Sequence, residues 1–140
     1  MRLSLFCLTV LLVSASAEAA SAQAKPASVR VVALRETTLK SGVSATEFER
    51  YFADSVAGPL NRHIPGVHAY LLKGERGARV GGYVIVYEFQ SLARRNAYFP
   101  RADTSSAMYQ RLAKALPANS MENLSRYVDV AAYTDYVVVR

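Results

Sequence analysis

The two histidines of the chain lie five residues apart in the segment NRHIPGVHAYLLKG, residues 61–74. Two imidazoles at this spacing have three possible roles: ligands of one metal ion, partners in proton transfer, or side chains at a junction between a helix and a strand. His63 ends a helical pattern, where a basic side chain neutralises the terminal carbonyl groups. His68 follows in a strand pattern, so the two rings diverge, and no third ligand at metal spacing lies nearby. The sequence therefore predicts no metal site and directs attention to His68.

His68 is a candidate acid–base group, because imidazole exchanges a proton readily near neutral pH. Tyr70 lies two residues further along, and side chains that alternate along a strand place both on one face of a sheet. An imidazole can take a proton from an activated carbon or phenol while a tyrosine hydroxyl stabilises the oxyanion. We therefore predict His68 and Tyr70 as catalytic residues, on the face of the sheet opposite the helices.

The same alternation predicts an aromatic lining around this pair, suited to a flat organic molecule. The predicted substrate-binding residues, from the third and fourth strands, are Tyr83, Ile85, Tyr87, Phe89, Asp129 and Tyr133. In the alternative interpretation these side chains simply pack a subunit interface, because a buried tyrosine ring with a reachable hydroxyl favours interfaces. The sequence leaves both interpretations open.

The elements that would position these residues follow the order β-α-β-β-α-β. A capping box at 44–47 and apolar residues at spacings of three and four predict a long first helix, which ends near His63 and is weakened by Pro59. Ser91, and Ser105 or Ser106, are the predicted caps of two later helices. The predicted strands cover residues 29–39, 66–74, 83–90 and 126–139, and the later helices cover 92–99 and the segment up to 116.

With right-handed crossovers, the helices of this order fall on one face of a four-stranded antiparallel sheet. The other face is apolar too, because residues 83–89 carry apolar side chains at both parities. The residues of the first strand expected on that face are Arg30, Val32, Leu34 and Glu36. A sheet that is apolar on both faces needs a second cover, and a second copy of the chain is the natural one. We therefore predict a homodimer joined sheet to sheet.

The beginning of the chain has the pattern of a secretory signal peptide. An apolar run at 3–13 is too short to cross a bilayer, and the small-residue segment after it offers cleavage after Ala22. The predicted organisation is a signal peptide at 1–22, a linker at 23–28 and one domain at 29–140. Hence we expect a periplasmic or secreted protein without stable membrane insertion. The single cysteine, Cys7, would leave with the signal.

The net charge of +6 does not indicate nucleic-acid binding, because the basic residues are dispersed in runs of no more than two. A solvated basic surface is the simpler interpretation, with a weak preference for anionic ligands. We therefore predict no nucleic-acid partner.

The chain resembles the dimeric α+β barrel superfamily in the segments LKSGVSATEFERYF, PGVHAYLLKGERG and YVIVYEFQSLARRNAYFP. The resemblance covers residues 29–136 and includes members similar to antibiotic-biosynthesis monooxygenases, NIPSNAP proteins and EthD proteins. It implies two ferredoxin-like protomers packed sheet to sheet into a barrel, with His68 and Tyr70 in its interior. Haem-degrading members use a helix-borne histidine and a tryptophan. This chain has no tryptophan, and residues 91–116 contain no histidine.

Two functions from different classes follow. The first is an exported enzyme that needs no organic cofactor and acts on an aromatic or polyketide-like molecule, as a monooxygenase or as a cyclase or isomerase. The alternative is a non-catalytic ligand-binding or structural dimer of the cell envelope. An interior cavity of a few hundred cubic ångströms that contains His68 and two or more tyrosines would favour the first.

Overall fold

One antiparallel sheet of four strands forms the framework of the protein. The computed structural model describes residues 28–102 and 104–139, so the predicted signal peptide at 1–22 and most of the predicted linker at 23–28 lie outside it. Neighbouring strands pair in the order β2-β3-β1-β4, all antiparallel. The strands are β1 (Val31–Leu39), β2 (Val67–Lys73), β3 (Tyr83–Phe89) and β4 (Val128–Val137).

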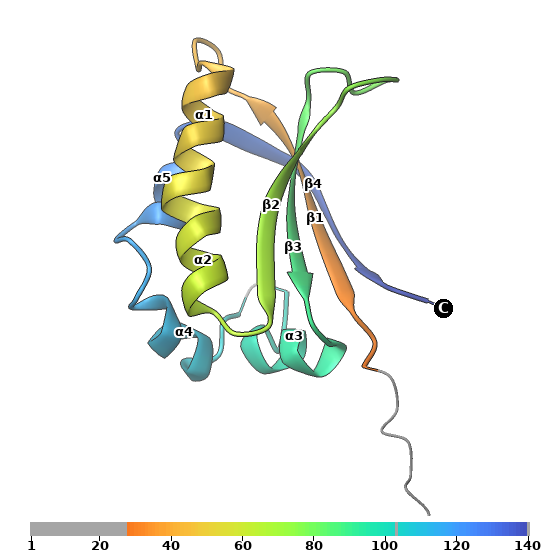
Figure 1. Ribbon diagram of the computed structural model, residues 1–140, viewed down its shortest axis with the longest axis vertical. Helices are drawn as coiled ribbons and strands as arrows, with labels where there is room; N and C mark the ends of the chain where they lie inside the picture. The colour runs from red at the N-terminus through yellow and green to blue at the C-terminus, as the bar shows by residue number, and fades with distance from the viewer. Residues whose placement is uncertain (1–27, 103, 140) are drawn as a thin grey trace, which may run out of the picture.

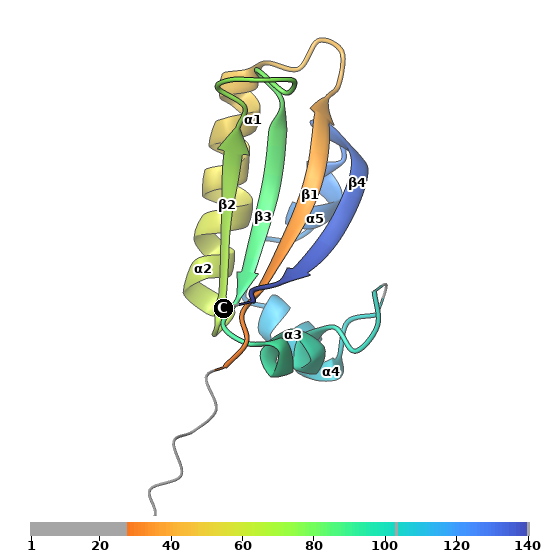
Figure 2. The ribbon, with the colours of Figure 1, turned by 90° about the vertical axis from the view of Figure 1, so that its right-hand side faces the viewer.

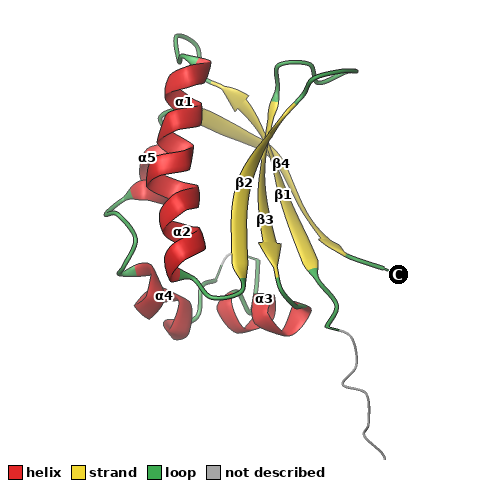
Figure 3. Ribbon diagram, viewed as in Figure 1, coloured by secondary structure: helices red, strands yellow, loops and turns green. Residues whose placement is uncertain are grey.

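The helices lie on one face of this sheet, as predicted, and the other face is bare within the described part of the chain (Figures 1 and 2). A long helical segment runs beside β2 and β3, and shorter helices follow near one end of the sheet (Figure 3) and behind β1 and β4 in the view of Figure 2. The helical elements are α1 (Ala45–Tyr51), η1 (Phe52–Ala57), α2 (Gly58–His63), α3 (Leu92–Tyr98), α4 (Ala107–Ala113) and α5 (Ser120–Leu124). This is the predicted α+β, ferredoxin-like arrangement.

The long helix contains a wider turn immediately before Pro59. Residues 52–57 form a π-helical segment, in which the Gly58 amide donates to the Ala53 carbonyl five residues back. Proline has no N–H to continue the α-helical ladder, and a π-turn is one way to absorb that loss. The sequence predicted a kink or a weakened last turn at Pro59; the irregularity is instead a π-helical segment before the proline, and residues 58–63 are α-helical. Ser44 occupies the N-cap position, but it makes no side-chain cap hydrogen bond, so the predicted capping box is not formed.

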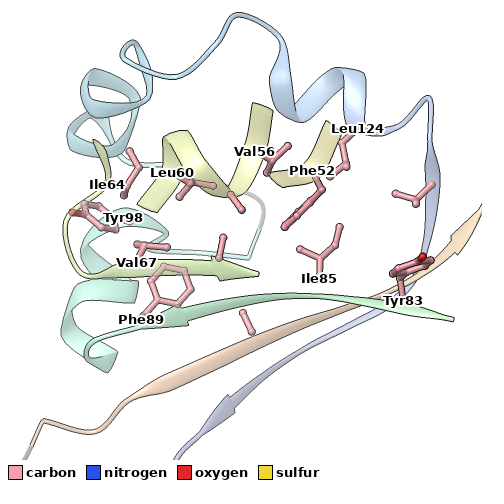
Figure 4. Packing of buried hydrophobic residues seen from close by; sticks show 14 of the residues in the cluster. Phe52, Val56, Leu60, Ile64, Val67, Tyr83, Ile85, Phe89, Tyr98 and Leu124 are labelled. Carbon is pink, nitrogen blue, oxygen red and sulfur yellow. The ribbon is translucent and has the colours of Figure 1, made fainter. Parts of the chain in front are cut away.

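The core lies between the long helix and strands β2 and β3. Figure 4 shows Phe52, Val56 and Leu60 pointing from the helix toward Ile85 and the other strand residues. Phe52, Val56 and Ile85 are each no more than 2% exposed. Burying a large aliphatic or aromatic side chain contributes roughly 1.5–3 kcal/mol, so this seam holds the helical layer on the sheet.

The structure corrects the predicted face of strand β3. Tyr83, Ile85, Tyr87 and Phe89 point toward the helices, not away from them, and three of these side chains, Tyr83, Ile85 and Phe89, are no more than 5% exposed. The register sets this face, because Ala69 pairs with Tyr87 while His68 pairs with Glu88. Both parities of β3 are apolar, so alternation within the strand could not decide between the two faces.

A bulge in β4 corrects the prediction that Asp129 and Tyr133 lie on one face of the sheet. Asp129 and Tyr133 have the same parity, yet Asp129 pairs with Thr38 and Tyr133 pairs with Arg35. The register shifts between Glu36 and Thr37, where β4 carries one extra residue. An extra residue reverses the facing of every side chain beyond it. Asp129 therefore lies on the uncovered face, and Tyr133 lies on the face toward the helices.

Strand β2 is an edge strand, and Asn61 of α2 covers part of its free edge. The Asn61 side-chain amide donates to the Ala69 carbonyl at 3.0 Å, and the Ala69 amide donates to the Asn61 Oδ1 at 2.6 Å. This double hydrogen bond occupies backbone groups that would otherwise be free to pair with another strand.

The uncovered face carries a mixed apolar surface. Its rows across the sheet follow from the registers: His68, Glu88, Val32 and Tyr136; then Tyr70, Val86, Leu34 and Thr134; then Leu72, Val84, Glu36 and Ala132. Leu72 is 48% exposed and Tyr136 is 53% exposed, whereas Val86 is fully shielded by its neighbours. We refer to the whole face that carries these three rows, including Asp129, as the uncovered face.

Candidate functional site

A cavity of about 300 Å³ lies between the sheet and the helical layer, over β1, β3 and β4. The long helix covers β2 and β3 closely, while β1 and β4 are covered only by the short helices and the loop that precedes α4 (Figure 2). Because this second cover is incomplete, Val130 and Tyr133 of β4 remain 55% exposed although they point toward the helices. These two residues line the open side of the cavity.

Charged side chains gather at one part of the cavity wall. Asp135 Oδ1 accepts a hydrogen bond from an Arg35 terminal nitrogen at 3.1 Å, and Asp135 Oδ2 lies 3.4 Å from an Arg95 terminal nitrogen. Arg35 and Asp135 are diagonal neighbours on adjacent strands, within reach of long side chains. The Arg35 guanidinium also lies 4.8 Å from the centre of the Tyr133 ring. We call Arg35, Arg95 and Asp135 the charged cluster.

The apolar walls of the cavity include an aromatic group from three elements. Phe89 of β3 meets Phe99 edge to face at 6.1 Å between ring centroids, and Phe99 lies 4.6 Å from Tyr109 of α4. Together with Ile85 and Leu124, these rings give the cavity largely apolar walls. Such walls match the faces of a flat, largely apolar molecule.

Two tyrosines of the cavity stay protonated well above neutral pH. Burial raises the pKa of Tyr87, the neighbouring Tyr109 raises it further, and the Arg35 guanidinium opposes the shift. Burial likewise raises the pKa of Tyr109. Both phenols are therefore neutral hydrogen-bond donors under physiological conditions.

The predicted catalytic pair lies on the other side of the sheet. His68 and Tyr70 share the uncovered face, with ring centroids 5.5 Å apart, and His68 is directly opposite Glu88. Burial and Glu88 raise the pKa of Tyr70. Neither residue borders the cavity. The catalytic role of this pair therefore stays a prediction, for a site on the uncovered face.

The predicted substrate-binding residues divide among three places. Ile85, Tyr87, Phe89 and Tyr133 do line one cavity together, although it lies on the side of the helices. Tyr83 is buried at the far end of the sheet, where its hydroxyl donates to Glu49, which also accepts from Lys73 at 2.9 Å. Asp129 pairs with Lys40 at 3.3 Å.

Sequence reasoning missed the charged cluster. Its signal was present in two strands: Arg35 occupies an inward position that follows Val31 and Ala33, and Asp135 occupies one in β4. A charged residue at an inward position is costly unless it is paired, so two opposite charges on neighbouring strands indicate a site or a structural ion pair. The β4 bulge hid this correspondence, since the facing of Asp135 could not be counted from Val128.

No group of three or more histidine, cysteine, aspartate or glutamate side chains converges in residues 28–102 and 104–139. In the same part of the chain, no helix combines the length and the apolar character needed to span a membrane.

Comparison with known proteins gives structural matches alone. No family model matches the chain, and no curated protein matches it. One similar solved structure is SnoaB, a cofactor-independent oxygenase from Streptomyces nogalater, with 19% identity and a TM-score of 0.49 over 81% of this chain and 96% of that chain. Another is a dimeric protein of unknown function with a ferredoxin-like fold from Bacteroides fragilis, with 14% identity and a TM-score of 0.47 over 78% of this chain and 96% of that chain.

Proposed function

We propose that this protein binds a flat, largely apolar small molecule in the cavity between its sheet and its helical layer. The observation that carries the proposal is the cavity itself, about 300 Å³ in volume, with aromatic walls and a few polar groups at one part. Ligand pockets of soluble proteins begin at about this size and combine apolar walls with a few placed polar groups. A space filled by side chains would instead indicate a structural role.

The proposal is tested with N-phenyl-1-naphthylamine, a neutral aromatic dye that fluoresces strongly in apolar sites. We expect saturable binding to the wild-type protein. Val130→Trp places an indole at the open side of the cavity and should weaken dye binding at least about tenfold, by occupying the ligand volume. Val80→Trp, in the loop between β2 and β3, is the matched control and should bind normally. No saturable binding by the wild type would refute the proposal.

A catalytic step is the second candidate, and the presence of both Tyr87 and Arg35 in the cavity lining favours it. A neutral phenol beside a guanidinium can stabilise an enolate or phenolate oxygen. Oxygenation, cyclisation or isomerisation of an aromatic or polyketide-like molecule without an organic cofactor would pass through such an anion. Among the described residues at the cavity, Asp135 is the only carboxylate, and it is engaged by two guanidinium groups. Binding is therefore the primary proposal.

We also propose that the protein is a homodimer joined through the uncovered face. The support is the partly exposed apolar surface of that face, including Leu72 and Tyr136. In this assembly, each cavity remains on the outer side of the joined sheets, so that ligands can enter without dissociation of the dimer. The catalytic prediction for His68 and Tyr70 belongs to the space between the two sheets.

A further inference from the structure

The charged cluster leaves an excess of positive charge in the cavity. Among the described residues that line it, Arg35, Arg95 and Arg101 are basic, and Asp135 alone is acidic. The carboxylate of Asp135 is shared between Arg35 and Arg95, and one negative charge cannot neutralise two guanidinium groups. In a partly enclosed space, such an imbalance is costly and attracts an anion.

Arg35 and Arg95, which both contact Asp135, differ in how many of their N–H groups have a hydrogen-bond acceptor. Arg35 donates to Asp135 at 3.1 Å and to the Leu34 carbonyl at 3.0 Å, and it also lies over the Tyr133 ring. Arg95 has its 3.4 Å contact with Asp135, but its Nε is buried without a hydrogen-bond partner among the described residues. A buried donor without an acceptor is rare in folded proteins and calls for an explanation.

The Arg95 side chain also borders the cavity. It projects from the last turn of α3 into the cavity, and its side chain is 25% exposed, so that it borders the space in which a ligand would lie. A guanidinium offers two parallel N–H groups to a carboxylate, a geometry that a single point charge does not provide. The Nε itself is buried, so any donor that Arg95 offers to a ligand is a terminal nitrogen.

Resting on the proposed binding function, we propose that the ligand carries an anionic oxygen group, of the carboxylate kind, which Arg95 binds. Asp135, which itself accepts a hydrogen bond from Arg35, holds the guanidinium in place, while the apolar ring system of the ligand lies against Phe99 and Ile85. The ligand class is therefore a flat aromatic acid. Tyr87, a neutral phenol that also lines the cavity, is the proposed donor to a second oxygen of such a ligand.

The test compares 2-naphthoate with 2-naphthamide, which share ring and size and differ in charge. Each competes with N-phenyl-1-naphthylamine for wild-type protein. We expect naphthoate to bind about tenfold more tightly than naphthamide or better, because charge-assisted hydrogen bonds are roughly twice as strong as neutral ones. Added salt should reduce this preference and leave naphthamide binding unchanged.

Variants assign the preference to Arg95. Arg95→Gln should abolish the preference for naphthoate and retain dye and naphthamide binding, which also shows that the cavity is intact. Arg94→Gln is the matched control, since Arg94 lies over the Tyr98 ring outside the cavity, and it should keep the preference. Asp135→Asn should increase the preference, because it removes the competing carboxylate.

The outcomes separate the two proposals. Failure of the dye and of both naphthalene compounds to bind wild-type protein overturns the binding function. Equal binding of naphthoate and naphthamide to wild-type protein leaves that function standing and overturns the anionic ligand. A preference that survives in Arg95→Gln overturns the role of Arg95. If this variant does not fold, as judged by circular dichroism, Arg95→Lys takes its place, and it should lower the preference because it loses the paired donors.

Discussion

Replacing Leu72 by aspartate should convert the protein from a dimer to a monomer. Leu72 lies on β2 in the uncovered face and is 48% exposed in the protomer. Because half of the side chain already reaches solvent, an aspartate there can be hydrated in the isolated protomer. In a sheet-to-sheet dimer the same carboxylate would be buried without a partner. The variant therefore opposes association and leaves folding largely intact.

The expected magnitude follows from the exposed half of the leucine. Full burial of a leucine is worth roughly 1.5–3 kcal/mol, so covering the remaining half contributes about 1 kcal/mol per copy. A buried, unpaired carboxylate adds a penalty of at least about 2 kcal/mol per copy. A two-fold interface applies both terms twice, which gives about 6 kcal/mol and weakens the dimer roughly 10⁴-fold.

The assay is sedimentation velocity at micromolar concentration, with circular dichroism to verify folding. Tyr136→Asp tests the other edge strand, β4, where Tyr136 is 53% exposed, and should also give a monomer. Val80→Asp is the control, because Val80 is 65% exposed in the loop between β2 and β3 and lies outside the uncovered face. A monomeric wild type, or dimers of both the Leu72 and Tyr136 variants, would refute the sheet-to-sheet argument.

Four further predictions concern other parts of the chain. Asn61→Ala should lower the free energy of unfolding by about 1–3 kcal/mol in urea denaturation, because it leaves two backbone groups of β2 without hydrogen-bond partners. Asn96→Ala also replaces an exposed asparagine and should have little effect. Hydrogen bonds from Tyr83 and Lys73 lower the pKa of Glu49 below its ordinary value of 4.5. Above pH 4.5, Glu49→Gln should therefore be less stable than the wild type in thermal melting. The difference in stability should disappear as the pH falls through the lowered pKa, and an equal loss at all pH values would contradict this linkage. His68→Gln should leave dye binding in the cavity unchanged, because His68 lies on the opposite face, and weaker binding would place the ligand elsewhere. Expressed in a bacterium with its full sequence, the protein should lose residues 1–22, and intact-mass measurement of exported protein tests that cleavage.

Much of the fold was predictable because its signals are local. Apolar periodicity predicts the strands and the first helix in their order along the chain. Hydroxyl side chains predict the caps at Ser91 and Ser106, and the structure has both caps hydrogen-bonded. Pro59 predicted a weak turn, although only the structure shows it as a π-helical segment. Helix α5 was missed, because it spans only Ser120–Leu124 and follows a left-handed residue, Asn119, with no clear periodicity.

The facing of side chains was less predictable, because it depends on pairing between strands distant in sequence. Within β2, the small set of Val67, Ala69 and Leu71 correctly indicated the side of the helices. Within β3, both sets are apolar, and the large aromatic residues proved to fill the space below the long helix. The bulge in β4 has no sequence signature comparable to a glycine or proline, so Asp129 and Tyr133 were assigned to one face.

Both faces of β3 are apolar, and this strand therefore takes part in both proposals, ligand binding and dimerisation. Ile85 and Tyr87 line the cavity, whereas Val86 between them faces away from the helices and is fully shielded on the uncovered face. An aspartate at Ile85, which sequence alone would favour as an interface test, would instead be buried below the helices and unfold the protomer. Ligand binding and association thus reside on opposite sides of one strand, a single residue apart. Substitutions at Leu72 and at Arg95 should accordingly separate them, each changing one property and leaving the other intact. A loss of naphthoate binding in monomeric Leu72→Asp would mean that the joined sheets help to shape the cavity.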